Sequence, residues 1–188
     1  MDYLSVRAGQ STVAAETSQD DLYREAAAEY GDALERLARA YEADADKRRD
    51  LLQEIHFALW RSFGGFDGRC SRRTWVYRVA HNAAASHVIR QRRANTEALA
   101  GLEEIEAAPD PRDEWLATGR REALERLLEL IRQLKPLDRQ IIFSYLEGLD
   151  AASIGEITGL SPGNVATKIH RIKTILTRRF HSGGSHGE

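Results

Sequence analysis

The most constraining stretch of this sequence is GLDAASIGEITGLSPGNVATKIHRIKTILTRRF, residues 148–180. Its helix-ending and helix-starting residues are spaced as in a helix-turn-helix. Gly159 ends a short amphipathic helix, because glycine tolerates the left-handed backbone that follows a helix C-terminus. Ser161 can cap the next helix, and Pro162 fits its first position. The pattern therefore predicts two helices joined by a tight turn.

The second helix of this motif has an apolar face and a polar face. The apolar residues recur at i, i+4, i+7 and i+11 and predict a buried seam: Val165, Ile169, Ile172 and Leu176. The opposite side carries Asn164, Thr167, Lys168 and Arg171. Residues 161–180 contain five Lys or Arg and no acid. Such a helix suits the major groove of DNA, against the alternative of a solvated basic face on an ordinary helix pair.

The composition favours an all-α protein. Ala, Leu, Arg and Glu are abundant, only four of the 188 residues are proline, and 42% are hydrophobic, which is enough for a core. No apolar run has the length of a membrane span, and the N-terminus lacks a signal-peptide layout. Cys70 is the single cysteine, so no intrachain disulfide can form and a reducing cytoplasm is the expected location.

Charge is strongly segregated along the chain, although the net charge is only −2. Residues 69–93 contain seven arginines and no acid, whereas residues 94–114 contain seven acids and one arginine. The first block predicts a basic surface. The second contains Pro-Asp-Pro, which opposes a continuing helix, and predicts a linker. The acidic run either shields the basic segment or is simply solvated.

Apolar periodicity predicts two small helical domains. Helices over 20–41, 46–62 and 71–93 form the first. A helix over 112–134, one capped by Asp138 and closed by Gly148, and the helix-turn-helix form the second. We expect these inward residues on the third and fourth helices: Trp75, Val79, Ala83, Val88, Leu124, Leu127, Leu128, Ile131 and Leu134. The predicted division is a disordered tail (1–19), a first domain (20–93), a flexible acidic linker (94–111), a second domain (112–181) and a disordered tail (182–188).

The sequence contains no pattern that indicates catalysis. We find no nucleophile–base set, no phosphate-binding glycine loop and no paired carboxylates whose surroundings would shift their pKa values. His81, His87 and Cys70 do not form a zinc set, because the ligand count is short and the histidines are two helical turns apart. An enzyme is therefore the least favoured class, and no cofactor or metal is expected. Cys70 is better explained as an inert small residue than as a redox-sensing thiol.

Two segments, in order and across the linker, resemble the sigma-70 family of bacterial transcription initiation factors. The resemblance is to its small two-domain group, the extracytoplasmic-function (ECF) sigma factors. Residues 50–93 resemble the second conserved region, with D-L-x-Q-E, a following W, T-W, A-x-N and a basic end. Residues 134–176 resemble the fourth region, with E-G, an I-x-E-I helix, a G-x-S turn and H-R. The resemblance implies region 2-like and region 4-like helical domains that bind core RNA polymerase and direct initiation at promoters.

The resemblance also implies a polymerase-docking surface. The D-L-x-Q-E helix would dock on the clamp helices of the largest polymerase subunit, while the flap region is the other expected contact. The docking residues implied are Asp50, Leu51, Gln53, Glu54 and Trp60. Apolar anchors ringed by acids and amides suit docking on a helical partner. The alternative is that Leu51 or Trp60 belongs to the core.

The basic segment would meet the −10 promoter element, where this family helps to open the duplex and captures a flipped base. Six arginines can neutralise phosphates: Arg69, Arg72, Arg73, Arg90, Arg92 and Arg93. Asn82 can bond an exposed base edge, and the loop over 66–73 can form a pocket for the extruded base. Trp75 is better explained as core than as a stacking platform, and Arg78 as a brace for the fold.

The helix-turn-helix would read the −35 element. Asn164, Thr167, Lys168 and Arg171 are the residues expected to face the groove, and His170 and Lys173 flank them and meet the backbone. The polymerase carries out the chemistry, so this chain would supply specificity and melting.

Some residues depart from the family pattern. Lys47, Arg48 and Arg49 stand where the family usually has acids, and Ser86 stands where it usually has Asp. A reversed charge weakens docking on a cationic surface. One hypothesis is that phosphorylation of Ser62 or Thr74 restores negative charge. The equally weighted alternative is that the three cations face solvent or phosphate.

Two other functions compete with the sigma-factor interpretation. A stand-alone, homodimeric helix-turn-helix regulator explains the second domain but leaves the D-L-x-Q-E helix without a role; it predicts tight duplex binding at palindromic half-sites. A protein-interaction decoy is compatible with the acidic linker but not with two basic surfaces. Many ECF sigma factors are held inactive by an anti-sigma factor, so such a partner is possible, and no membrane insertion is expected.

Overall fold

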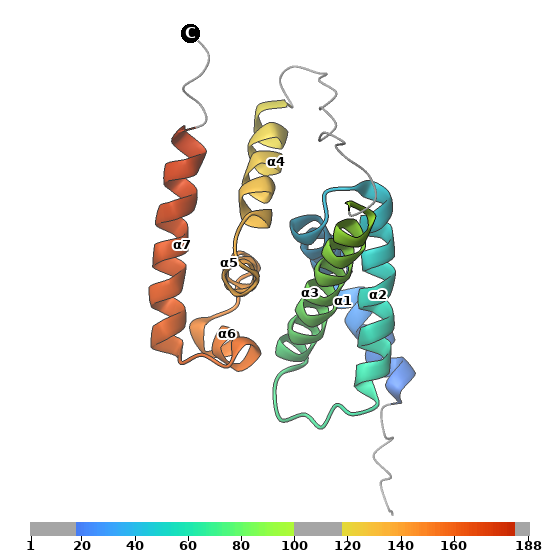
Figure 1. Cartoon of the computed structure of the whole chain (residues 1–188). Helices are drawn as coiled ribbons and strands as arrows, with labels where there is room; N and C mark the ends of the chain where they lie inside the picture. Colours follow the sequence, from blue (N-terminus) through green and yellow to red (C-terminus); the bar gives the residue numbers. More distant parts are fainter. Residues whose placement is uncertain (1–17, 100–117, 183–188) are drawn as a thin grey trace, which may run out of the picture.

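The computed structural model describes residues 18–99 and 118–182, and the regular secondary structure of this part is entirely α-helical. This part contains seven helices, and Figure 1 labels them in chain order. They are α1 (Gln19–Tyr41), α2 (Ala45–Phe63), α3 (Arg72–Leu99), α4 (Thr118–Arg132), α5 (Pro136–Leu146), α6 (Ala151–Thr158) and α7 (Pro162–Ser182).

Helices α1, α2 and α3 form the first bundle. Each of the first two begins at a side-chain cap: Ser18 accepts from the backbone N–H of Asp21, and Asp44 accepts from those of Asp46 and Lys47. The bundle interior is aliphatic and fully enclosed, with Leu34, Leu37, Leu51, Ile55, Leu59, Val76 and Ala80 at 0–1% exposure. This interior fixes which faces of α2 and α3 remain outside.

Helices α4 to α7 form the second bundle, whose interior includes Ile131, Ile141, Ile154, Val165 and Ile172. The turn between α6 and α7 has the predicted geometry. Gly159 lies in the left-handed region with φ of 75°, and the Ser161 hydroxyl accepts from the N–H of Asn164 at 3.3 Å. Gly155 is also required here, because a Cβ would lie 2.6 Å from the carbonyl oxygen of Leu160. The helix-turn-helix is therefore confirmed.

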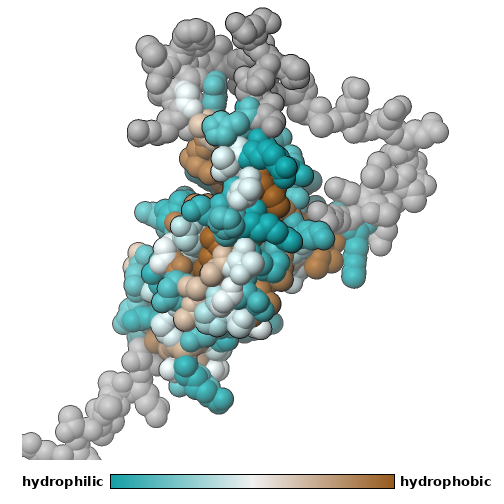
Figure 2. Space-filling model, turned by 90° about the vertical axis from the view of Figure 1, so that its left-hand side faces the viewer, coloured by the Kyte–Doolittle hydropathy of each residue, from teal (hydrophilic) through white to brown (hydrophobic). Residues whose placement is uncertain are grey.

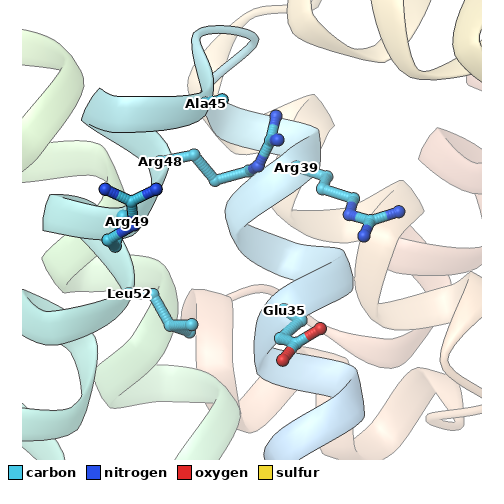
Figure 3. A pocket seen from close by; sticks show the side chains of 6 residues that line it. All are labelled: Glu35, Arg39, Ala45, Arg48, Arg49 and Leu52. Carbon is cyan, nitrogen blue, oxygen red and sulfur yellow. The ribbon is translucent and has the colours of Figure 1, made fainter.

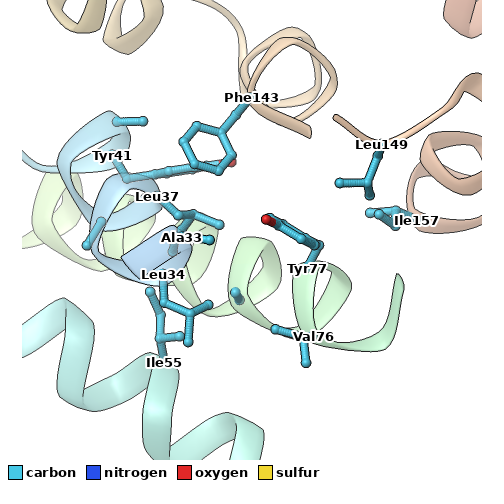
Figure 4. Close-up of a cluster of buried hydrophobic side chains, with 14 of the residues drawn as sticks. Ala33, Leu34, Leu37, Tyr41, Ile55, Val76, Tyr77, Phe143, Leu149 and Ile157 are labelled. Atoms are coloured by element: carbon cyan, nitrogen blue, oxygen red, sulfur yellow. The ribbon is translucent and has the colours of Figure 1, made fainter. Parts of the chain in front are cut away.

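The two bundles pack directly against one another. Helix α3 contacts α5 and α6, and α1 contacts α4. Figure 4 shows Tyr77 of α3 between Tyr41 of α1 and Phe143 of α5 on one side and Leu149 and Ile157 on the other. These side chains belong to one continuous cluster of buried apolar residues.

Several helix-level predictions were wrong in detail. Helix α3 continues to Leu99, six residues past the predicted boundary at Arg93, whereas residues 100–117 lie outside the described part. Leu124, predicted to face inward, is 51% exposed. Asp138 does not cap α5; Lys135 holds that position without a side-chain cap, and Pro136 starts the helix.

The buried face of α3 also differs from the predicted one. The predicted residues, Trp75, Val79, Ala83 and Val88, are only partly buried. The fully buried positions are Thr74, Val76, Tyr77, Ala80, His81, Ala84 and His87. The cause is that α3 packs on α1 and α2 from one side and on α5 and α6 from another, so its buried arc is rotated and wide.

Candidate nucleic-acid interface

Helix α7 presents the predicted polar face to solvent, with one exception. Asn164, Thr167 and Arg171 are exposed, whereas Lys168 is partly buried. The Lys168 ammonium lies 2.7 Å from Oδ1 of Asp138, and the Arg171 guanidinium lies 3.6 Å from Oδ2 of the same carboxylate. Because only 11% of the Asp138 side chain is exposed, this pairing holds Lys168 against α5.

The outer face of α7 extends further along the helix than the sequence interpretation had placed it. A hollow there is lined by His170, Lys173, Thr174, Thr177 and Arg178. Three of these residues, Thr174, Thr177 and Arg178, were missed. The sequence alone could have identified these three residues, because they continue the i+3 and i+4 spacing of Thr167 and His170. Figure 2, which views this side of the molecule, shows pale and brown side chains interspersed with hydrophilic ones.

The basic segment is paired with acceptors inside the molecule. Arg69 lies 2.7 Å from Asp67, Arg72 bonds Glu25, and Arg90 bonds Glu54. Arg73 donates to the backbone carbonyl of Glu147 on the other bundle. Arg93 is exposed, and the side chain of Arg92 lies outside the described part. Phosphate would therefore have to displace these acceptors before the arginines bind it.

Asn82 is exposed on α3 and borders a groove between α2 and α3. The groove has a volume of about 360 Å³ and is lined by Ala58, Arg61, Ser62, Val79, Asn82, Ala83 and Ser86. Arg61, missed by the sequence interpretation, contributes a cation from the facing helix. The predicted Asn82 and the divergent Ser86 therefore lie in one hollow, with an arginine beside them.

Trp75 and Arg78 support the fold, as predicted. The Trp75 indole N–H donates to the Ser62 hydroxyl at 2.9 Å, and its ring packs edge-on against Phe66 at 5.3 Å between centroids. The Arg78 guanidinium lies 4.7 Å from the Trp75 ring centroid and 3.8 Å from Sγ of Cys70. These contacts fix the loop that precedes α3.

Helix α2 offers an exposed face that combines acids, an amide and aromatic rings. Asp50 and Gln53 are exposed, and Glu54 is 40% exposed while bound to Arg90. Trp60 is 39% exposed and its indole N–H donates to Asp20 at 2.8 Å. Leu51 does not lie on this face. It is 0% exposed and packs in the core of the first bundle, which was the alternative interpretation.

Phe57 lies on the same exposed face of α2 and was missed by the sequence interpretation. It is 61% exposed, the largest exposure among the large apolar side chains described, and its ring lies 6.2 Å from that of Trp60. It follows Gln53 and Glu54 by one helical turn, so the periodicity of α2 could have identified it. An exposed aromatic pair beside polar groups is typical of an interaction site.

The three cations at the start of α2 are directed differently from one another. Arg48 donates to the carbonyl of Ala43 at 3.0 Å, Arg49 lies 3.4 Å from Asp46, and Lys47 is exposed. Arg48 and Arg49 line a small pocket of about 150 Å³ with Glu35, Arg39, Ala45 and Leu52. Figure 3 shows that the guanidiniums of Arg39, Arg48 and Arg49 do not converge on a common point. This arrangement favours the solvent-facing alternative for these residues.

The two candidate phosphorylation sites are engaged in the fold. Thr74 is 2% exposed and bonds the Ser71 hydroxyl at 2.9 Å. The Ser62 hydroxyl donates to the Leu59 carbonyl and accepts from Trp75. A kinase would need local unfolding to reach either hydroxyl, so the geometry does not support that hypothesis.

Among residues 18–99 and 118–182, no group of three His, Cys, Asp or Glu side chains is arranged to hold a metal ion. Within the same ranges no helix combines the length and hydropathy needed to cross a membrane.

The fold and the site together define a helical DNA-binding regulator whose second bundle carries a helix-turn-helix. The family described as Sigma-70 region 2 matches residues 17–94, and Sigma-70, region 4 matches residues 124–176. The chain belongs to the sigma-70 family, in its ECF group, and is a sigma factor that directs transcription initiation.

Known relatives and a solved structure agree with this placement. The chain is 32% identical over 127 residues to RNA polymerase sigma factor CarQ of Myxococcus xanthus, covering 65% of this chain and 68% of CarQ. It is 30% identical over 164 residues to ECF RNA polymerase sigma factor SigE of Mycolicibacterium smegmatis, covering 84% and 60% of the two chains. The fold matches the sigma factor RpoE, solved with the anti-sigma factor NepR from Bartonella quintana, with a TM-score of 0.64 and 18% identity over 86% of this chain and 96% of that one.

Proposed function

We propose that residues 20–93 of this sigma factor dock on core polymerase and open the −10 element, and that residues 112–181 read the −35 element. Residues 94–111 join the two. The observation that carries the proposal is the exposed docking face of α2 on one bundle together with an exposed helix-turn-helix on the other.

The docking face consists of Asp50, Gln53, Glu54, Phe57 and Trp60, and its partner is the clamp helices of the largest polymerase subunit. The Phe57–Trp60 pair supplies apolar anchors, and the surrounding carboxylates and amide supply polar contacts. The Lys47–Arg49 edge lies at the start of the same helix and faces solvent. The flap region of polymerase is the proposed contact of the second bundle.

The −10 site is formed by the basic segment around the α2–α3 groove. Asn82 and Arg61 line that groove, and an extruded base would find an amide and a guanidinium there. The residues proposed to bind phosphates are Arg69, Arg72, Arg73, Arg90, Arg92 and Arg93. The first four would exchange their internal partners for phosphate. Charge-assisted Arg–phosphate bonds are strong enough to compete with exposed ion pairs.

The −35 site is the outer face of α7. Asn164, Thr167, His170 and Arg171 are proposed to reach base edges, and Lys173, Thr174, Thr177 and Arg178 to follow the backbone. Lys168 is held by Asp138, so its proposed role is to position the helix and present its remaining N–H bonds to phosphate.

Because a sigma factor acts together with RNA polymerase, we propose that this protein works in the cytoplasm. Because the related RpoE was solved with an anti-sigma factor, we propose that a protein of that kind also regulates this chain. We assign no enzymatic activity to it, since the polymerase carries out the chemistry.

The docking assignment is tested by replacing Phe57 with Asp and measuring binding of the full chain to purified core RNA polymerase. Placing a charge in an apolar contact should weaken binding by roughly 30-fold, which corresponds to about 2 kcal/mol for an anchor residue. The matched control is Leu124→Asp, an exposed leucine on α4, which should bind as the wild type does. Equal binding by Phe57→Asp and the wild type would refute the docking face.

The alternative function, a stand-alone regulator, predicts the opposite result for DNA binding by the free chain. It would bind a palindromic duplex tightly as a homodimer without polymerase. We expect the free chain to bind duplex DNA weakly, because Arg69, Arg72 and Arg90 of the basic segment are already paired with acids inside the molecule. A gel-shift titration of the free chain against promoter duplexes separates the two functions.

A further inference from the structure

The two bundles are joined by a polar cluster centred on Glu147, at the end of α5. Arg36 of α1 donates from Nε and Nη2 to the two Glu147 carboxylate oxygens, each at 2.7 Å. The Tyr77 hydroxyl of α3 donates to the same carboxylate at 3.2 Å, and Arg73 donates to the Glu147 carbonyl. Only 11% of the Glu147 side chain is exposed. One residue of the second bundle therefore binds three side chains of the first.

A second polar contact lies deeper in the same interface. His81 of α3 is 2% exposed and lies between Tyr41 of α1 and Ser144 of α5. Its Nδ1 is 3.0 Å from the Tyr41 hydroxyl, and its Nε2 is 3.1 Å from the Ser144 hydroxyl. Phe143 packs edge-on against the imidazole at 5.7 Å between centroids. Both ring nitrogens have partners, so the packing of the bundles is specific rather than a loose apolar contact.

This packed arrangement cannot engage both promoter elements. Positions −35 and −10 are about 25 base pairs apart, which at 3.4 Å per pair is about 85 Å along the duplex. A packed protein of this length has a radius of gyration of about 16 Å, hence a diameter of roughly 40 Å. The two DNA-reading surfaces must therefore separate. The covalent connection allows this, because the 18 residues of 100–117 can reach about 60 Å when fully extended.

We propose that Arg36, Tyr77, His81, Ser144 and Glu147 form an interdomain latch that holds the free sigma factor closed, and that engaging a promoter requires this latch to open. The inference rests on the proposed two-element recognition. Arg73 couples the two states. Its guanidinium binds the Glu147 carbonyl in the closed protein and is proposed to bind a −10 phosphate in the open one. DNA phosphate and the second bundle compete for it.

The latch is tested by measuring the distance between two spin labels on the full-length free protein. The labels replace Asp46 of α2 and Glu156 of α6, both exposed, in a Cys70→Ser background. We expect one narrow distance distribution. Arg36→Glu sets two carboxylates against each other and should shift the distribution to long, broad distances. The double variant Arg36→Glu/Glu147→Arg recreates the pair and should return the narrow distribution.

The matched control is Arg24→Glu, which removes an ion pair within α1 (Arg24–Asp21, 2.6 Å) and should leave the distances unchanged. A broad distribution for the wild type, or a narrow one for Arg36→Glu, would overturn the latch. Circular dichroism on each variant separates opening from unfolding, since opening retains the helical signal.

Promoter binding by the polymerase complex gives a second readout. If the closed state is about 90% populated, releasing it raises the apparent affinity of the complex for a two-element promoter duplex about tenfold, because only the open fraction engages both elements. Arg36→Glu should show this gain and Arg24→Glu should not. Opening of Arg36→Glu in a chain that binds no polymerase would leave the latch standing and remove the proposed function. Equal promoter affinity of the two variants within the polymerase complex would remove the latch and keep the function.

Discussion

At the scale of single residues, Asp138 is the residue that most changes the interpretation of helix α7. Its position after Lys-Pro suggested a helix cap, yet it is a buried carboxylate inside α5 that binds Lys168 and faces Arg171. Nothing in the local sequence indicates a partner 30 residues away. Side-chain pairing between helices is decided by packing, so the spacing on α7 alone could not separate a DNA-reading lysine from a positioning one.

Asp138→Asn should destabilise the second bundle, because it leaves the partly buried Lys168 ammonium with a neutral acceptor. We expect a loss of about 1–3 kcal/mol in the free energy of unfolding. Urea denaturation followed by circular dichroism measures it. Asp46→Asn, which weakens an exposed pair with Arg49, is the control and should lose less than about 1 kcal/mol. Equal midpoints for Asp138→Asn and the wild type would contradict this account.

His81 should make stability depend on acidity. Burial lowers the pKa of His81 to about 3, so the folded protein resists a proton that the unfolded chain accepts near its ordinary pKa of 6.5. Its contribution is therefore fully present above about pH 6.5 and is lost as the pH falls toward 3. Between pH 7.5 and 5 the free energy of unfolding should fall by about 2 kcal/mol from this group.

The check is urea denaturation of the wild type and of His81→Gln at both pH values. The variant is less stable at pH 7.5 but should show a smaller decrease on acidification. His56→Gln is the matched control, since burial also lowers the pKa of His56, although that residue lies on α2, outside the interdomain contact. The same pH dependence in His81→Gln and the wild type would show that another group is responsible.

At the scale of helices, sequence periodicity located the elements well but not always their faces. Helices α1 and α2 begin and end within one residue of the predicted bounds, and α7 begins at Pro162 as predicted from the Ser-Pro pair. On α2 the spacing of Leu51, Ile55 and Leu59 follows the buried face, and Phe57 lies outside that spacing, so its exposure could have been predicted from the sequence. On α3 the face was misjudged because this helix packs against both bundles.

The outer face of α7 gives a prediction at this scale. Arg178→Ala should weaken binding of a −35 duplex by the polymerase complex uniformly across sequences and reduce the slope of log affinity against log salt by about one. Asn164→Ala should instead relax sequence preference. Arg121→Ala, an exposed arginine on α4, should change neither property. A salt slope unaltered by Arg178→Ala would exclude backbone contact at that end of α7.

At the scale of the whole molecule, the sequence predicted two helical domains and a family resemblance that the comparisons confirmed, but not how the bundles meet. Arg36 and Glu147 are 111 residues apart, and each is an unremarkable surface charge in its own helix. Their pairing depends on the shape of two bundles at once. Packing also explains why the basic segment, expected to be open, is partly neutralised: Arg72 and Arg90 bond acids within the first bundle, and Arg73 bonds a carbonyl of the second.

The central claim is that this chain gives RNA polymerase its choice of promoter, and run-off transcription tests it most directly. Purified core polymerase, with and without the full-length chain, is supplied with a genomic promoter library, and the 5′ ends of the transcripts are mapped. We predict new start sites that share a two-element motif and that disappear with Phe57→Asp. Start sites identical with and without the chain would contradict the account.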